Sequence, residues 1–88
     1  MGEFIKVILA DDHELVRDGI RLLLESEKGI EVVDEASDGL QALEVLEKNV
    51  GLADLIVVDI RMPKMNGIEV VEQINKRNIP VKTLVLSM

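Results

Sequence analysis

The amino-acid sequence predicts an α/β domain built on a doubly wound, parallel sheet. Apolar residues recur at alternate positions in some segments and at intervals of about 3.6 residues in others, and the two kinds of segment alternate along the chain. That alternation is typical of the strands and helices of a parallel sheet. The connections are short, and right-handed crossovers between parallel strands then place helices on both faces. No repeat, linker or low-complexity tract divides residues 1–88, so we expect one compact domain.

Four segments have the composition of β-strands. Leu55–Val58 is a continuous apolar run that ends at Asp59, which is typical of a central strand covered on both faces. Ile30–Ala36 is more polar, which indicates a strand at the edge of the sheet. The four expected strands are Phe4–Ala10, Ile30–Ala36, Leu55–Val58 and Val81–Ser87.

Three segments repeat their apolar residues at helical spacing. The first covers Glu14–Ser26. We expect the second to begin after Asp38, with Gln41 in the place of a capping-box partner, and the third to begin after Asn66, with Glu69 in the same place. The expected buried faces are Val16, Ile20, Leu23 and Leu24 in the first helix, Leu40, Leu43, Leu46 and Val50 in the second, and Ile68, Val71, Ile74 and Asn75 in the third.

The composition excludes several classes of function. The net charge of −7 repels phosphate backbones, and Phe4 is the only aromatic residue, so we expect no direct nucleic-acid binding by this segment. The absence of cysteine excludes disulfides, thiol catalysis and cysteine-bound zinc, and it is compatible with a reducing compartment. No segment reads as a signal peptide or membrane span, so we expect a cytoplasmic protein with no membrane contact.

Polar side chains follow three of the expected strands, where each strand ends. Asp11 and Asp12 follow the first strand, Asp59 ends the third and Ser87 ends the fourth. Each acid taken alone could serve only as a helix cap or a strand end. The carboxyl ends of parallel strands, however, meet at one edge of the sheet, and clustered carboxylates suit a hard cation such as Mg²⁺, which also binds phosphate oxygens. The coincidence therefore favours a Mg²⁺-dependent phosphoryl site.

Three stretches of the chain resemble the receiver domain of two-component response regulators. They are Ile8–His13, Val57–Gly67 and Leu84–Ser87. The Asp-His-Glu-Leu-Val-Arg run at residues 12–17 resembles the subgroup with a downstream helix-turn-helix DNA-binding domain. The resemblance covers the whole chain in order. It implies a flavodoxin-like sheet with strand order 2-1-3-4, here a partial receiver of four strands and three helices that lacks the fourth helix, the fifth strand and the fifth helix.

The resemblance also implies a role for each site residue. Asp59 would be the phosphoacceptor, taking a phosphoryl group from a phosphohistidine on a sensor histidine kinase. Asp11, Asp12, Asp59 and the backbone carbonyl of Arg61 would hold Mg²⁺, with Asp11 acting largely through water. Ser87 would be the switch hydroxyl that binds a phosphoryl oxygen. On this reading the domain is a regulatory phosphoacceptor and no conventional multiple-turnover enzyme.

Two departures from the family pattern are expected to impair phosphoryl uptake. The family places a lysine at the end of a fifth strand, which this chain does not contain, and Lys6 is expected at the opposite end of the first strand. Met88 is also bulky where many relatives have a small residue. The fourth strand would be an uncovered apolar edge, so we expect a homo-oligomer formed through that edge or the uncovered face.

Other functions remain open at this point. One is a structural or engineered half-domain fragment that self-associates without signalling. Another is a Mg²⁺-dependent aspartyl-phosphate phosphatase, although such enzymes usually need an acid two residues after the nucleophile, where Arg61 stands. A nucleotide-binding Rossmann domain is disfavoured because the first turn lacks the glycines it requires. His13 could be a ligand or a proton shuttle, but we expect it to be an exposed residue at the start of a helix.

Overall fold

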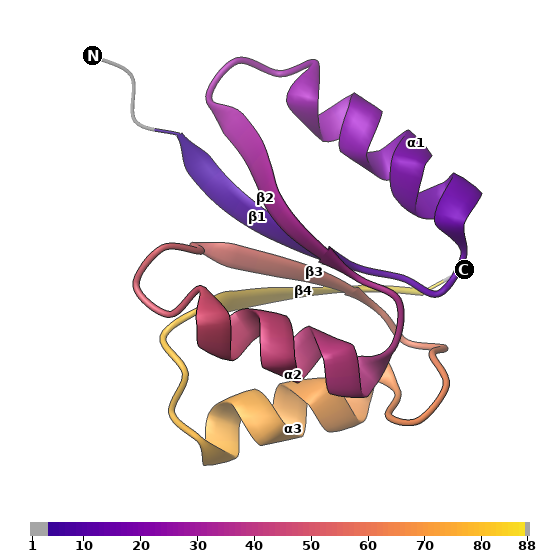
Figure 1. Cartoon of the computed structure of the whole chain (residues 1–88), viewed down its shortest axis with the longest axis vertical. Helices are drawn as coiled ribbons and strands as arrows, with labels where there is room; N and C mark the ends of the chain where they lie inside the picture. Colours follow the sequence, from indigo (N-terminus) through magenta and orange to yellow (C-terminus); the bar gives the residue numbers. More distant parts are fainter. Residues whose placement is uncertain (1–3, 88) are drawn as a thin grey trace.

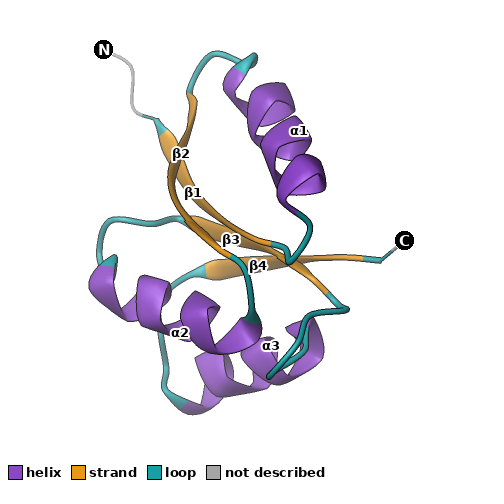
Figure 2. Ribbon diagram, turned by 45° about the vertical axis from the view of Figure 1, so that its right-hand side comes forward, coloured by secondary structure: helices purple, strands orange, loops and turns teal. Residues whose placement is uncertain are grey.

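The computed structural model describes residues 4–87 as a parallel sheet with helices on both faces (Figure 1). The chain alternates regularly between strands and helices. Helix α1 lies on one face of the sheet, and α2 and α3 lie side by side on the other (Figures 1 and 2). The elements are β1 (Ile5–Ala10), α1 (Glu14–Glu25), β2 (Ile30–Ala36), α2 (Gly39–Lys48), β3 (Leu55–Asp59), α3 (Gly67–Lys76) and β4 (Lys82–Leu86).

The strand order β2-β1-β3-β4 confirms the predicted doubly wound, flavodoxin-like topology. All three neighbouring pairs are parallel. The more polar strand β2 lies at one edge, as its composition predicted. Because β1 and β3 are direct neighbours, their carboxyl ends lie beside each other, with Ala10 paired to Val58. The topology therefore brings the first and third strand ends to one place.

The core lies mainly between the sheet and helices α2 and α3. Ile8, Ile56 and Val58 on the central strands have no measurable exposure, and Leu46 of α2 and Val70 of α3 pack in the same cluster. Full burial of such a side chain stabilises the fold by about 1.5–3 kcal/mol. A smaller buried cluster, Val7, Leu9 and Val57, lies on the α1 side. Strands β1 and β3 are thus covered on both faces.

The predicted buried faces of the helices are partly wrong. Leu40 and Ile68 are half exposed, at 49% each, and Leu23 is 72% exposed. The observed stripes begin instead at buried glycines, and they run Gly39, Ala42, Leu43 and Leu46 in α2 and Gly67, Val70 and Ile74 in α3. The contacts of the two glycines are tight: a Cβ on Gly39 would clash with Met65 in the loop after β3, and a Cβ on Gly67 would clash with Asp59 and Ile60. Each helix therefore begins with its glycine packed against this part of the chain.

Both predicted N-caps are present. Asn66 and Glu69 form a full capping box at the start of α3, which confirms the prediction. Asp38 accepts a hydrogen bond from the Gln41 backbone, as expected. The Gln41 side chain, however, bonds Ser37 and not Asp38, so the predicted reciprocal partner at α2 is wrong. Ser37 donates both its backbone N–H and its hydroxyl to Gln41 Oε1, so that oxygen is already occupied.

The α1 side of the sheet leaves apolar surface exposed. No residue of α1 is fully buried, and Leu15, Leu22 and Leu23 are 86%, 68% and 72% exposed. On β4, Leu84 pairs with the buried Val57 yet remains 50% exposed, because α1 lies over β1 and β2 (Figure 1). Among residues 4–87, no helix combines the length and the apolar character needed to span a bilayer.

Substitution of Gly67 tests the close approach of α3 to the loop after β3. An alanine Cβ at Gly67 would overlap the backbone oxygen of Asp59 and lie 3.0 Å from the Ile60 Cα. We expect Gly67→Ala to lower the free energy of unfolding by about 1–3 kcal/mol, measured by urea denaturation. The matched control is Gly19→Ala in the exposed middle of α1, where a Cβ meets nothing within 4 Å. That variant should gain about 0.5–1 kcal/mol. Equal stability of the two variants would contradict the steric account.

Candidate functional site

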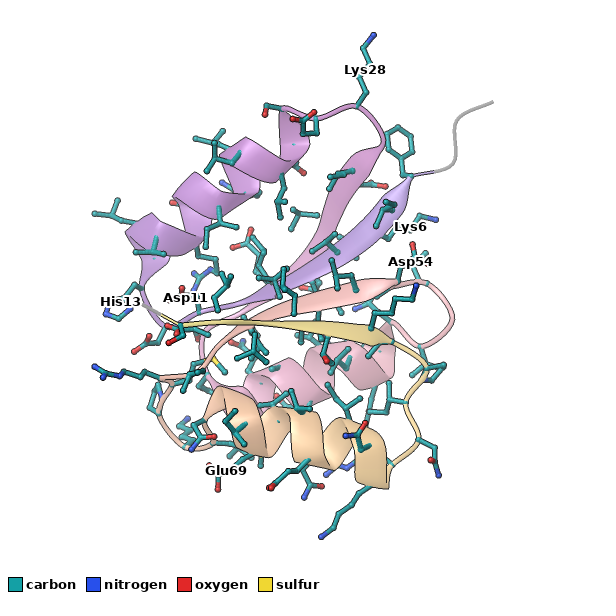
Figure 3. The ribbon with its side chains drawn as sticks, turned by 180° about the vertical axis from the view of Figure 1, so that it is seen from behind. Lys6, Asp11, His13, Lys28, Asp54 and Glu69 are labelled. Carbon is teal, nitrogen blue, oxygen red and sulfur yellow. The ribbon has the colours of Figure 1, made fainter. Side chains whose placement is uncertain are left out.

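The three predicted carboxylates converge at the carboxyl end of the sheet. One oxygen from each of Asp11, Asp12 and Asp59 and one ring nitrogen of His13 all lie within 4.8 Å of one another. The acids come from separate chain segments, and the adjacency of β1 and β3 brings them together. Figure 3 shows Asp11 and His13 together at this end of the molecule. The structure therefore assembles the acidic cluster that the strand ends predicted.

Asp11 is the most firmly held of these acids. Asp11 is only 6% exposed, and among residues 4–87 it is the one charged residue that is buried. The Asp11 carboxylate accepts a hydrogen bond from the His13 backbone at 2.8 Å. Its own backbone N–H donates to the Ala36 carbonyl at 3.1 Å, and its carbonyl accepts from the Arg17 guanidinium at 2.7 Å. Every polar group of Asp11 thus has a partner, which offsets the cost of burying a charge.

Asp59 lies half-buried at the end of β3. Its carboxylate oxygen Oδ1 accepts a long hydrogen bond, 3.3 Å, from the backbone N–H of Arg61. The backbone N–H of Gly67 donates to the Ile60 carbonyl at 2.8 Å and fixes the loop that follows. One side of the Asp59 carboxylate therefore faces open space at the rim of the sheet.

A cavity of about 310 Å³ lies against this carboxylate. It is lined by His13, Asp59, Ile60, Arg61 and Ser87. Water occupies about 30 Å³ per molecule in the liquid, so the cavity has room for a phosphoryl group and several waters. Ser87, the predicted switch hydroxyl, thus shares a cavity with the predicted phosphoacceptor. The predicted role of the Arg61 carbonyl stays a prediction, since Arg61 contacts the Asp59 carboxylate through its backbone N–H.

The donor set fits a hard divalent cation. Three carboxylates in one small volume repel each other, and a cation bound among them relieves that repulsion. Carboxylate oxygens and water are the ligands that Mg²⁺ prefers. The His13 ring adds a nitrogen, with Nδ1 at 3.0 Å from Asp12 Oδ1 and 3.4 Å from Asp11 Oδ1. Nitrogen suits transition metals better, so oxygen atoms alone account for the fit to Mg²⁺.

The contacts that His13 and Arg17 make at the site were not predicted from the sequence. His13 is 67% exposed at the helix start, as expected, and yet its ring lies within reach of the acids. Arg17 contacts both Asp11 and Glu35, and sequence reasoning gave it no role. Helical side chains lean toward the N-terminus of their helix, so a long side chain one turn into α1 was a usable signal for a contact with Asp11.

Lys6 lies far from the acidic cluster, as predicted. Figure 3 shows it near Asp54, at the opposite end of the sheet from Asp11. A larger cavity of about 620 Å³ also lies at that opposite end and includes Asp54 and Lys82 in its lining. We place the functional site at the smaller cavity because the acids that converge at the end of the sheet meet open space there. Met88 lies outside the described residues.

Comparisons with known proteins agree with this geometry. A family model described as the response regulator receiver domain matches residues 7–88. The transcriptional regulatory protein DegU of Brevibacillus brevis is 42% identical over 84 residues, which cover 96% of this chain and 35% of DegU. The chain therefore spans about a third of that relative.

Solved structures superpose closely on this chain. The signal receiver domain described for NarL of Mycobacterium tuberculosis matches with a TM-score of 0.90 and 35% identity, over 97% of this chain and 67% of that one. A chain of the CheX–CheY–BeF₃–Mg²⁺ complex of Borrelia burgdorferi matches with a TM-score of 0.88 and 25% identity, over 94% of this chain and 61% of that one.

Substitution of Asp12 tests whether the acids repel one another. Neutralising one carboxylate removes repulsion worth about 1 kcal/mol between charges a few ångströms apart in water. We expect Asp12→Asn to raise the melting temperature without metal and to abolish most of the stabilisation that Mg²⁺ gives the parent. Asp54→Asn, the same charge change at the opposite end of the sheet, should leave the Mg²⁺ effect intact. Thermal melts with and without Mg²⁺ measure both, and a lower metal-free melting temperature for Asp12→Asn would contradict the repulsion.

Proposed function

Because the chain belongs to the response regulator receiver domain family, we propose that it is the phosphoacceptor part of a signalling switch. Asp59 receives the phosphoryl group, and a phosphohistidine of a sensor histidine kinase donates it. The observation that carries the proposal is the meeting of Asp59 with Asp11 and Asp12 beside an open cavity. The Asp59 carboxylate is the acid of this cluster that lines the cavity.

The transfer itself is a displacement at phosphorus. A carboxylate oxygen of Asp59 attacks the phosphorus atom, the bond from phosphorus to the kinase imidazole nitrogen breaks, and an acyl phosphate forms. Such transfers depend on in-line placement and on neutralisation of charge more than on covalent help from the protein. Asp59 is suited to the placement, because β3 and the Gly67 contact fix its backbone. The domain is thus modified by its partner and is no multiple-turnover enzyme.

Mg²⁺ is the cofactor that the acidic cluster would hold. Asp11, Asp12, Asp59 and the backbone carbonyl of Arg61 are the proposed ligands, and the bound ion would neutralise charge on the phosphoryl oxygens. The matched CheX–CheY complex contains both Mg²⁺ and the beryllium fluoride group. The residues of this chain keep the carboxylates in place: the His13 and Arg61 backbones donate to Asp11 and Asp59, respectively.

Ser87 is the proposed switch residue. It lines the cavity with Asp59 and follows directly on β4. Its hydroxyl would donate to a phosphoryl oxygen on Asp59, and the strand end would move with it. The backbone N–H of Ile60 donates to the Leu86 carbonyl at 3.1 Å, so the end of β4 is coupled to the loop after Asp59. A new charge at Asp59 would in this way become a shape change.

The proposed partners follow from the family. The relative DegU is named as a transcriptional regulatory protein and is about three times as long as the matched segment. We propose that the whole protein containing this segment regulates transcription in the cytoplasm through a DNA-binding domain elsewhere in its chain. This segment, with a net charge of −7, does not contact DNA directly.

A second candidate function is a self-associating half-domain that does not signal. The observation that favours it is the exposed apolar surface of α1 and β4, with Leu22, Leu23 and Leu84 at 68%, 72% and 50% exposure. The phosphatase alternative has less support, because the exposed Arg61 occupies the position of its second acid.

Phosphoryl uptake by the 88-residue chain tests the main proposal. Within residues 4–87 the cavity lining includes no lysine, and loss of a fixed cation commonly costs about 10²–10³-fold in rate. We expect slow, Mg²⁺-dependent labelling of Asp59 by acetyl phosphate, detected by intact mass, and faster labelling of a chimera that continues into the remaining receiver segment of DegU. Asp59→Asn should abolish labelling in both, whereas Asp54→Asn should not. Labelling that survives Asp59→Asn would refute the proposal.

Sedimentation of the same chain tests self-association. We expect dimers or larger species at tens of micromolar, since exposed apolar surface and an open strand edge favour pairing. Leu84→Lys should shift the distribution toward monomer because lysine protects strand edges. Lys82→Leu, the opposite change on the same strand, should shift it toward larger species. A stable monomer in the parent chain would argue against self-association.

A further inference from the structure

Arg17 links helix α1 to the backbone of the acidic site. Its Nε donates to Glu35 Oε1 at 2.8 Å, and its Nη1 donates to the Asp11 carbonyl at 2.7 Å. The side chain is only 15% exposed, so these bonds form largely out of water. We infer that Arg17 is a positioning residue, which fixes the peptide group between Asp11 and Asp12 and thereby sets the affinity of the site for its cation. This inference rests on the proposed function.

The peptide group is the physical element through which Arg17 acts. A peptide group is planar and rigid, so the Asp11 carbonyl and the Asp12 N–H turn as one unit. Arg17 holds this unit at its oxygen, and the Ala36 carbonyl holds the preceding unit at the Asp11 N–H, at 3.1 Å. These two units fix the direction of the Asp11 side chain and the position of the Asp12 Cα. The next unit is held at the His13 N–H, which donates to the Asp11 carboxylate at 2.8 Å, so the direction in which the Asp12 side chain leaves the backbone is fixed as well. Asp12 needs this support because its own carboxylate is 30% exposed, and the His13 ring nitrogen that lies 3.0 Å from it belongs to a side chain that is 67% exposed.

Glu35 is the anchor that holds Arg17 in place. It lies on β2 opposite Leu9 of β1, and its second oxygen accepts from Arg21 Nη1 at 2.7 Å. The hydrogen bond to Glu35, assisted by the Glu35 charge, raises the pKa of Arg21 above its ordinary value. One carboxylate therefore ties two successive turns of α1 to the sheet edge. The planar guanidinium then bridges Glu35 and the Asp11 carbonyl at once, a task that suits a fork of donors better than a single ammonium.

Positioning and simple electrostatics predict opposite effects on metal binding. A cation beside the site repels Mg²⁺, so removal of the Arg17 charge should tighten binding if charge were its only influence. If Arg17 instead holds the Asp11–Asp12 peptide group, its removal should weaken binding. Loss of a group that orients metal ligands typically costs about 10–100-fold in affinity, and we expect the Arg17 variants to lie at the lower end of that range.

The experiment measures Mg²⁺ affinity and the Asp12 amide signal in the same variants. Arg17→Met keeps the apolar stem and removes the donors, and Arg17→Lys keeps the charge and loses the fork. Arg77→Met is the matched control, since Arg77 forms a 2.7 Å bond to Glu47 between α3 and α2 without contact to the site. Calorimetric titration with Mg²⁺ gives the affinity, and the ¹⁵N–¹H spectrum of the metal-free protein reports the peptide group.

We expect Arg17→Met to bind Mg²⁺ about tenfold more weakly and to move the Asp12 amide signal. Arg17→Lys should do the same to a smaller extent, and Arg77→Met should do neither. If Arg17→Met does not fold, Arg17→Lys decides. Equal or tighter Mg²⁺ binding in the folded Arg17 variants would overturn the inference, as would weaker binding with the Asp12 signal unmoved. A parent chain that binds no Mg²⁺ would instead refute the proposed function, while the Asp12 signal would still test the positioning.

Discussion

Repulsion among three carboxylates is the constraint around which this domain is built. Asp11, Asp12 and Asp59 are held within 4.8 Å of each other although nothing in their own chemistry favours the approach. The energy that holds them comes from the strands behind them. Ile8, Ile56 and Val58 are fully buried on neighbouring parallel strands. Burial of such side chains contributes more free energy to folding than the repulsion between partly exposed charges costs. The acids gather where the sheet ends because the core places those ends side by side.

Backbone donors and glycine contacts then fix the loops that carry the acids. The His13 and Arg61 N–H groups donate to Asp11 and Asp59, which partly compensates their charge. Helices α2 and α3 approach the loop after β3 through Gly39 and Gly67, where a side chain would clash with that loop. The loop is therefore in direct contact with both helices of one layer. If a phosphoryl group on Asp59 displaced the loop after β3, the displacement would change the contacts of that loop with both helices.

Helix α1 is attached to the sheet differently from the other two. It has no fully buried residue, and polar bonds from Arg17 and Arg21 to Glu35 supplement its apolar contacts with β1 and β2. Hydrogen bonds are directional and apolar contacts are not. A few hydrogen bonds therefore restrict the position of a nearby peptide group more closely than apolar packing does. The same helix exposes Leu15, Leu22 and Leu23, and Leu84 of β4 is half exposed on the same face of the sheet. The polar contacts beside Asp11 and the exposed apolar side chains thus belong to the same helix.

The sequence by itself determined the strands, the doubly wound arrangement, the polar edge and the acids at the strand ends, and the resemblance to receiver domains implied the strand order. Alternating periodicity, right-handed crossovers and strand-end carboxylates are local or topological signals, and Asp38, Asn66 and Glu69 cap helices through contacts only three residues long. Only the tertiary structure decided which helix faces are buried and which side chains support the acids. Leu40 and Ile68 read as core yet remain exposed, because two glycines determine how closely the helices approach the loop. The contact of Arg17 with Glu35 joins two elements that are 18 residues apart in the chain, and no pattern along the chain measures that distance.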